Sequence, residues 1–205
     1  MIRIIFILTL LSLYAFGASK KALIGYYPSW AFYTAGNTVH AKDLRPESID
    51  YSKWDRINYS FYYLTESGEV IGTDEWADES QLFGPQNWNG GGTPVAIRRS
   101  VSPWSGVAMP GKTANFDVEK GLIGRTHAAG KQFFISIGGW TGSVPFIKMV
   151  ASSSARTRFV KDCMSLMRPF AQGGYDLDGI DLDWEYPGDT HSYQNQNGTV
   201  THNGT

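Results

Sequence analysis

The sequence predicts a globular α/β protein with a parallel sheet, and two observations support this fold class. Four short segments rich in Ile, Tyr, Phe or Trp have strand character: residues 22–27, 56–64, 132–138 and 179–185. Helical patterns separate the later segments, and strand–helix–strand alternation indicates parallel strands joined by helical crossovers. Hydrophobic residues make up 42% and charged residues 18% of the 205 residues, which excludes a disordered chain.

Two helices are expected between these strands. Residues at helical spacing mark the first helix, which Gly130 closes: Phe116, Lys120, Ile123 and His127. The second covers residues 155–170, with Ser154 as its candidate cap and Gly173-Gly174 beyond its end. Residues 65–113 are rich in Gly, Pro and Asn and predict a long ordered loop or a small insertion. The polar tail, residues 189–205, is expected to be a loop.

The N-terminus has the pattern of a secretory signal peptide. Residues 4–16 are almost all apolar and follow Arg3, but 13 residues are too few for a membrane span of ~20. Ala15, Phe16 and Gly17 place small residues at the spacing of a cleavage site. We expect residues 1–17 to be removed, leaving a secreted domain over residues 18–205 without stable membrane association. An uncleaved anchor or a buried helix is the alternative.

Charge and cysteine content exclude several classes of protein. The chain has 18 Lys and Arg against 19 Asp and Glu, so no broad basic surface for nucleic acid is expected. One cysteine, Cys163, excludes a disulfide-rich or Cys-rich zinc module. We expect Cys163 to be a buried, inert thiol, or to pair with a partner outside this sequence.

The segment 178–188 carries the candidate chemistry. Strand side chains alternate between faces, so Asp181, Asp183 and Glu185 are expected to share one face. Three acids in a row raise one another's pKa values, so at least one proton is retained or shared, as acid catalysis requires. Glu185 comes last, where a parallel strand opens onto its carboxyl-end crevice.

The opposite face of this strand is apolar. Ile180, Leu182 and Trp184 are expected to pack on helices, whereas Asp178 has the other parity and belongs to the strand entrance. The alternative is a half-exposed strand whose solvent face happens to be acidic. A calcium loop is rejected because Tyr186 stands where an EF-hand loop needs Gly.

Residues 106–113 match the phosphate-binding pattern G-x-x-x-x-G-K-[ST], from Gly106 to Thr113. That motif needs a buried strand before it and a helix after it, and residues 98–105 are a poor strand. We therefore interpret the match as a surface turn. The four His residues are scattered and show no metal-ligand spacing, so no metal or cofactor is expected.

Four segments resemble glycoside hydrolase family 18, the chitinase family. Asp178-Gly-Ile-Asp181-Leu-Asp183-Trp-Glu185-Tyr-Pro is similar to its signature D-G-x-D-x-D-W-E-Y-P, and Ser136-Ile-Gly138-Gly139-Trp140 to its S-x-G-G-W. Residues 24–27 and 57–61 resemble the family's first and second strands. The resemblance covers about residues 21–188 and implies a (β/α)8 TIM barrel.

The resemblance also implies an activity and a set of site residues. It implies retaining hydrolysis of β-1,4-linked N-acetylglucosamine polymers, with the substrate's acetamido oxygen as the nucleophile. Glu185 would act as acid and then base, Asp183 would orient the acetamido group, and Asp181 would share a proton with Asp183. Tyr26 and Ser136 would hydrogen-bond Asp181, and Phe61 and Trp140 would line the sugar subsites. The other supporting residues are Gly138, Gly139, Asp178 and Tyr186.

The sequence departs from the family pattern after its fourth strand. Only roughly the first four βα units of a barrel are expected within 205 residues, because a whole barrel takes ~250. We expect the truncated chain alone to have little activity. A chitin-binding lectin of the same fold is the alternative function, although such relatives usually lose the acid. Asn197 and Asn203 begin sequons for N-glycans.

Overall fold

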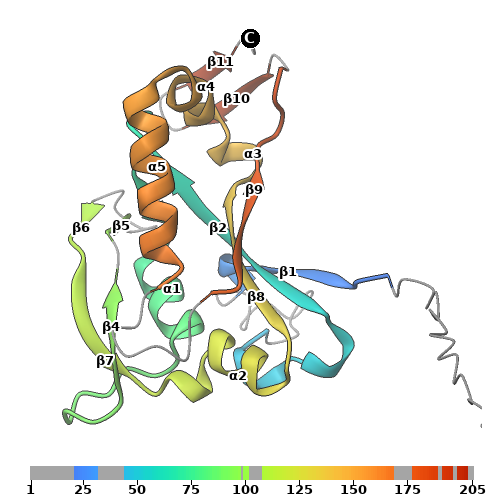
Figure 1. Cartoon of the computed structure of the whole chain (residues 1–205), viewed down its shortest axis with the longest axis vertical. Coiled ribbons are helices and arrows are strands. Elements are labelled where there is room, and N and C mark those ends of the chain that lie inside the picture. Colours follow the sequence, from blue (N-terminus) through green and yellow to red (C-terminus); the bar gives the residue numbers. More distant parts are fainter. Residues whose placement is uncertain are drawn as a thin grey trace, which may run out of the picture.

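The structure is a computed structural model that describes residues 21–31, 44–97, 99–101, 108–168, 177–188, 191–195 and 198–202 (Figure 1). The predicted signal peptide and both predicted glycosylation sites lie outside these residues. In the described part of the chain, no helix combines the length and the apolar character that crossing a membrane would need.

Strands, α-helices and short 3-10 helices alternate along the chain. The strands are β1 (Ile24–Pro28), β2 (Arg56–Leu64), β3 (Val70–Gly72), β4 (Thr93–Ile97), β5 (Ser100–Val101), β6 (Ala108–Met109), β7 (Lys112–Phe116), β8 (Gln132–Gly138), β9 (Gly179–Asp183), β10 (His191–Asn195) and β11 (Gly198–His202). The α-helices are α1 (Glu75–Leu82), α2 (Leu122–Ala128), α3 (Gly139–Gly142), α4 (Val144–Ala151) and α5 (Ser153–Leu166), and the 3-10 helices are η2 (Pro46–Ser48), η3 (Tyr51–Lys53) and η4 (Val118–Lys120).

The four predicted strands form one parallel arrangement. β1, β2, β8 and β9 lie side by side in chain order, and each pairs in parallel with the next. The register places Ser136 of β8 beside Asp181 of β9, and Gly138 beside Asp183. The predicted α/β class is confirmed, and parallel strands in chain order are the units from which a (β/α)8 barrel is built.

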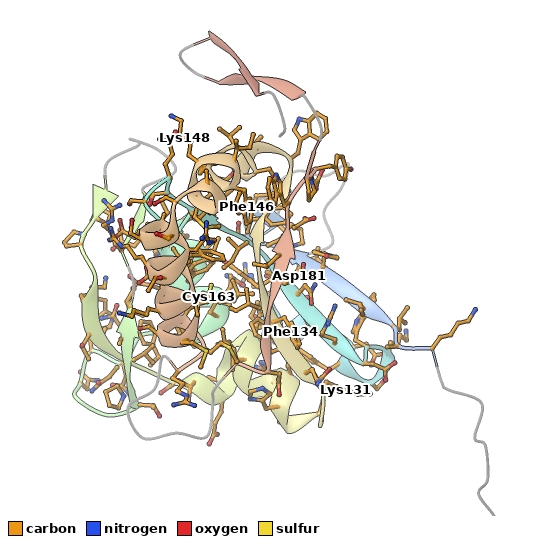
Figure 2. All side chains as sticks on the ribbon, turned by 45° about the horizontal axis from the view of Figure 1, so that its top comes forward. Lys131, Phe134, Phe146, Lys148, Cys163 and Asp181 are labelled. Carbon is orange, nitrogen blue, oxygen red and sulfur yellow. The ribbon has the colours of Figure 1, made fainter. Side chains whose placement is uncertain are left out.

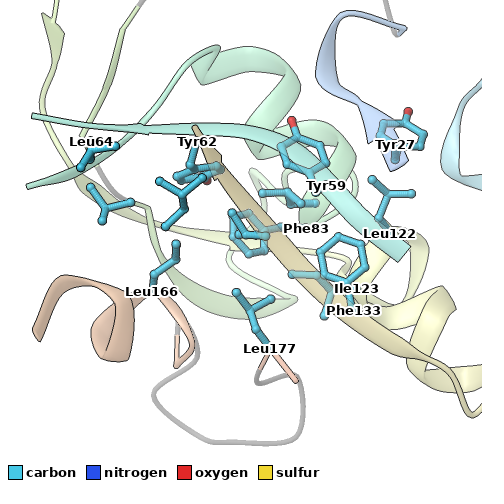
Figure 3. Packing of buried hydrophobic residues seen from close by; sticks show 14 of the residues in the cluster. Tyr27, Tyr59, Tyr62, Leu64, Phe83, Leu122, Ile123, Phe133, Leu166 and Leu177 are labelled. Carbon is cyan, nitrogen blue, oxygen red and sulfur yellow. The ribbon is translucent and has the colours of Figure 1, made fainter. Parts of the chain in front are cut away.

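Buried aromatic and aliphatic side chains join the sheet to its helices. Tyr59 of β2, Phe133 of β8 and Leu122 of α2 are fully buried, and Figure 3 shows them within one cluster. Tyr59 and Phe133 lie on the strand face that packs against helices such as α2, so burial of this face fixes the strand register. α5 runs along the sheet, with α4 at one end (Figure 1).

A buried polar pair lies between β2 and α1. The Tyr59 hydroxyl donates to Asp78 Oδ1 at 2.7 Å, and the Asp74 backbone N–H donates to Asp78 Oδ2 at 3.3 Å. Asp78 is only 3% exposed, and its burial raises its pKa to about 8. A carboxyl group in this position keeps its proton at neutral pH because the charged form is poorly solvated.

Residues 65–113 form a small insertion with its own secondary structure. β3 pairs with β2, β4 pairs with β7, and α1 lies between them in sequence. Within the phosphate-loop match, Lys112 begins strand β7, where the motif needs a helix, and its Nζ lies 2.9 Å from Glu79 Oε1. The strand in this position supports the rejection of a phosphate-binding loop, and the predicted surface turn is reduced to the short stretch between β6 and β7.

Several predicted boundaries were wrong. Phe116 ends strand β7, and the helix marked by Ile123 and His127 begins only at Leu122. Ser152, instead of Ser154, caps α5, whose Cys163 is half-buried. The tail predicted as a loop contains the antiparallel pair β10–β11, whose residues Thr199, Val200 and Thr201 favour strands.

Candidate active site at the end of strand β9

The predicted acidic row lies on β9 and just beyond its end. The β8–β9 ladder closes with Gly138 beside Asp183, so Glu185 stands two residues past the last paired position. Figure 2 shows Asp181 on β9, next to β8. A carboxyl group just outside a parallel strand's carboxyl end is open to the crevice where α/β proteins bind ligands.

Two hydroxyl groups, one from β1 and one from the adjacent strand β8, hold Asp181. The hydroxyl of Tyr26 on β1 donates to Asp181 Oδ2 at 2.9 Å, and that of Ser136 on β8 donates to the same oxygen at 2.8 Å. Both hydrogen bonds that the family resemblance implied are present. Burial and then the bond to Asp181 raise the pKa of Tyr26, so the phenol remains a donor.

Asp183 lies in an environment that favours its protonated form. Burial raises its pKa most, followed by the charges of Glu185 and then Asp181. Like charges on one strand face disfavour simultaneous ionisation. The site can therefore retain a proton at a pH where an isolated aspartate would have lost it.

Removing the charge of each neighbouring acid should lower the pKa of Asp183 by a different amount. Glu185→Gln is expected to lower it more than Asp181→Asn does, because Glu185 contributes the larger charge effect. Burial should keep it raised in both variants. Carboxyl ¹³C chemical shifts followed against pH measure it, and a larger drop in Asp181→Asn would contradict this ordering.

An aromatic groove runs beside the acids. Tyr26, Trp30, Phe61 and Asp183 contribute to its lining, together with Pro28 and Ser60. Trp30 stacks on Phe61 with ring centroids 6.2 Å apart, and it is 54% exposed. Flat exposed aromatic faces suit the apolar faces of sugar rings.

The two glycines after Ile137 allow the end of β8 to approach its neighbours. Both have positive φ, +117° at Gly138 and +74° at Gly139. A Cβ on Gly138 would lie 2.3 Å from the Asp183 carbonyl oxygen, and one on Gly139 would lie 2.7 Å from the Phe61 ring. Both positions therefore require glycine. Trp140 follows them and is 52% exposed.

Asp178 and Tyr186 occupy opposite ends of the acidic segment. Asp178 Oδ2 accepts the Phe133 backbone N–H at 2.7 Å and lies 3.0 Å from His127 Nε2. Its side chain joins α2 to the start of β8, at the end of the strands opposite to Glu185. Tyr186 lies exposed beside Glu185.

The apolar face of β9 is only partly covered. Trp184 stacks on Phe146 of α4 at 5.2 Å, and Ile180 packs against the core, as expected. The expectation for Leu182 was wrong, because this side chain is largely exposed. In the described part of the chain, β9 is the last paired strand on its side of the sheet.

Sequence reasoning missed one buried residue next to the acids. The Ser143 hydroxyl accepts the Glu185 backbone N–H at 2.8 Å, although 42 residues separate them. A serine at a helix start gives no sequence signal of such a contact. Among the residues that the structure describes, no group of three or more His, Cys, Asp or Glu is placed to hold a metal ion.

A parallel α/β sheet with a row of carboxyl groups at the carboxyl end of one strand, and an aromatic groove beside it, can supply a general acid next to a binding surface. The family model described as Glycosyl hydrolases family 18 matches residues 22–199. The chain belongs to this family.

Relatives and solved structures agree with this assignment. The chain is 27% identical over 166 residues to Endochitinase 1 of Metarhizium anisopliae, covering 80% of this chain and 31% of that protein. It is 29% identical over 181 residues to Chitinase A1 of Niallia circulans, covering 83% and 24%. The Ostrinia furnacalis Group II chitinase catalytic domain 2 shares the fold, with a TM-score of 0.52 and 21% identity over 81% of this chain and 32% of that one.

The chain spans about a third or less of the length of these relatives. Family membership supports a chitinase-type glycosidase at the level of the family.

Proposed function

We propose that the protein hydrolyses β-1,4-linked N-acetylglucosamine polymers with retention of configuration. The observation that carries this proposal is the acidic row itself, in which Asp181 is held by two hydroxyls and the pKa of Asp183 is raised beside Glu185. The chitinase relatives supply the substrate class. The predicted export signal over residues 1–17 agrees with an extracellular polymer as substrate.

In the proposed mechanism, Glu185 protonates the glycosidic oxygen as the bond to the leaving sugar breaks. The acetamido oxygen of the reacting sugar attacks its own anomeric carbon and gives a cyclic oxazolinium ion. Glu185 then takes a proton from the water that opens this ring, so it acts first as acid and then as base.

Asp183 and Asp181 have supporting roles in this scheme. Asp183 accepts the acetamido N–H and stabilises the positive charge of the intermediate. Its raised pKa allows it to hold a proton before substrate binds, and Asp181 accepts this shared proton when Asp183 turns to the substrate. The Tyr26 and Ser136 hydroxyls keep Asp181 in place throughout.

The aromatic groove supplies the binding surface in this proposal. Phe61 and Trp140 line the sugar subsites, and Trp30 extends the groove because it is exposed and stacked on Phe61. Gly138 and Gly139 let the Asp183 main chain and the Phe61 ring approach the end of β8 closely. Chitin oligosaccharides are the expected ligands.

Substrate assistance gives the sharpest test of this function. The purified natural protein should cleave a β-1,4 N-acetylglucosamine oligomer and release the β-anomer first, as ¹H NMR would show. The matched oligomer without acetyl groups should not be cleaved, because it lacks the nucleophilic oxygen.

Three other results would count against the proposal. Equal cleavage of both oligomers, or first release of the α-anomer, would contradict the mechanism. Binding of the acetylated oligomer without any cleavage would instead support the lectin-like alternative.

A further inference from the structure

The main chain at Glu185 is not held by the sheet. The paired residues of β8 and β9 end with Gly138 and Asp183, and Glu185 lies beyond them. Its backbone N–H therefore has no strand partner in the ladder. A buried N–H outside the ladder needs another acceptor, or it costs free energy.

Ser143 supplies that acceptor from the junction between α3 and α4. Its Oγ accepts the Glu185 N–H at 2.8 Å and lies 2.9 Å from the Gly139 carbonyl oxygen and 3.2 Å from the Asp183 carbonyl oxygen. A serine hydroxyl has one proton and two acceptor sites, so it can accept from Glu185 while donating to either carbonyl. The side chain is completely buried.

The residue between Asp183 and Glu185 is fixed by the same junction. The Trp184 ring stacks on Phe146, with the ring planes 10° apart, and Phe146 lies three residues after Ser143. Ser143 therefore contacts Asp183 and Glu185, and Phe146 in the first turn of α4 contacts Trp184 between them. These contacts fix the position of the Glu185 main chain relative to the end of β9.

The Ser143 hydroxyl does not cap α4; besides the Gly139 carbonyl of α3, its hydrogen-bond partners lie in the segment Asp183–Glu185. Ser143 stands at the N-cap position of α4 but makes no capping hydrogen bond. Ser152, in the same position of α5, accepts the Ala155 N–H. A serine that leaves its helix uncapped and contacts a segment 42 residues away acts on that segment.

We propose that Ser143 is a positioning residue for Glu185, holding its main chain so that its carboxyl group meets the scissile bond. This inference rests on the proposed function, because Glu185 is the acid only in that reaction. A misplaced acid loses rate more than binding, since a shift of about 1 Å in a catalytic group can cost on the order of a hundredfold.

The test compares Ser143→Ala, Ser143→Thr and the control Ser152→Ala in the natural protein. Ser143→Ala should lower kcat on the acetylated oligomer by about tenfold or more, which corresponds to one lost hydrogen bond. KM should stay within about twofold, because the groove residues are untouched. Ser143→Thr keeps the hydroxyl and should recover most of kcat, and Ser152→Ala should leave kcat unchanged per folded molecule.

Amide hydrogen exchange provides a second measurement that does not need turnover. The Glu185 N–H should exchange about tenfold or more faster in Ser143→Ala than in the wild type, and unchanged in Ser152→Ala. If the wild type cleaves nothing, the proposed function fails, and exchange at Glu185 alone decides whether Ser143 holds this segment.

The inference is overturned if Ser143→Ala retains its kcat, or if the Glu185 N–H stays protected. It is also overturned if Ser152→Ala loses as much kcat, because the effect would then be one of general stability.

Discussion

Glu185→Gln is expected to lower the cleavage of an N-acetylglucosamine oligomer by about 10²- to 10⁴-fold, the usual contribution of a general acid. Gln has nearly the same shape, but its amide protons are not acidic enough to be transferred to the leaving oxygen. Binding should persist, because the groove is formed by other side chains, including Trp30 and Phe61. Steady-state kinetics and calorimetric titration with the same oligomer measure the two effects separately.

Glu66→Gln is the matched control. Glu66 is an exposed glutamate whose carboxylate pairs with Lys148 at 2.8 Å, outside the groove. Its substitution should change neither kcat nor affinity. Turnover by Glu185→Gln at the wild-type rate would remove Glu185 from the mechanism, whereas loss of both turnover and binding would indicate a structural role.

Asp78→Asn is expected to remove a large pH dependence of the free energy of unfolding. In the folded wild type the pKa of Asp78 is about 8, whereas an unfolded aspartate titrates near 4. Between these values the folded state binds more protons than the unfolded state, so stability falls as pH rises. At about 1.4 kcal/mol per pKa unit, the effect is on the order of several kcal/mol.

The difference between wild type and variant should change sign with pH. Near pH 5, Asn loses the hydrogen bond that the Asp74 N–H makes to Asp78 Oδ2, so the variant should be less stable. Near pH 9 the wild type contains a buried negative charge that Asn lacks, so the variant should be more stable.

Urea unfolding at several pH values measures this crossing. Asp117→Asn is the control, because an exposed hydrogen bond with Lys120 lowers the pKa of Asp117, and its contribution is lost only as pH falls toward that pKa. A wild-type stability that does not fall between pH 5 and 9 would contradict the prediction.

The parallel strands were predictable because their residues have the strand propensity that a buried sheet requires. The predicted bounds of β2 and β8, residues 56–64 and 132–138, match the structure, because both segments are rich in aromatic residues and Ile, which favour strands. The acids were predictable for the opposite reason. A row such as Asp181, Asp183 and Glu185 suits a strand poorly and indicates a site.

Helix α1 could not be predicted from periodicity. Its buried face includes Asp78, Glu79 and Gln81, so it lacks the apolar stripe by which a helix is recognised. These polar residues are satisfied by partners distant in sequence, such as Tyr59 for Asp78 and Tyr27 for Gln81. The role of Ser143 was not predictable for the same reason. Its contact with Glu185 joins residues far apart in sequence and depends on the position of α3 at the end of β8.

The alternation along β9 has a consequence for how the family can diverge. A substitution changes one carboxyl group and the pKa values of its neighbours, but it leaves the other side chains on the same face. Insertion or deletion of one residue between Gly179 and Asp183 cannot be absorbed in the same way. It would rotate every later residue to the other face, carrying Glu185 toward Phe146 and Trp184 toward the groove. A change of length inside β9 therefore disrupts the acidic row unless a β-bulge restores the register, whereas a substitution leaves the register unchanged.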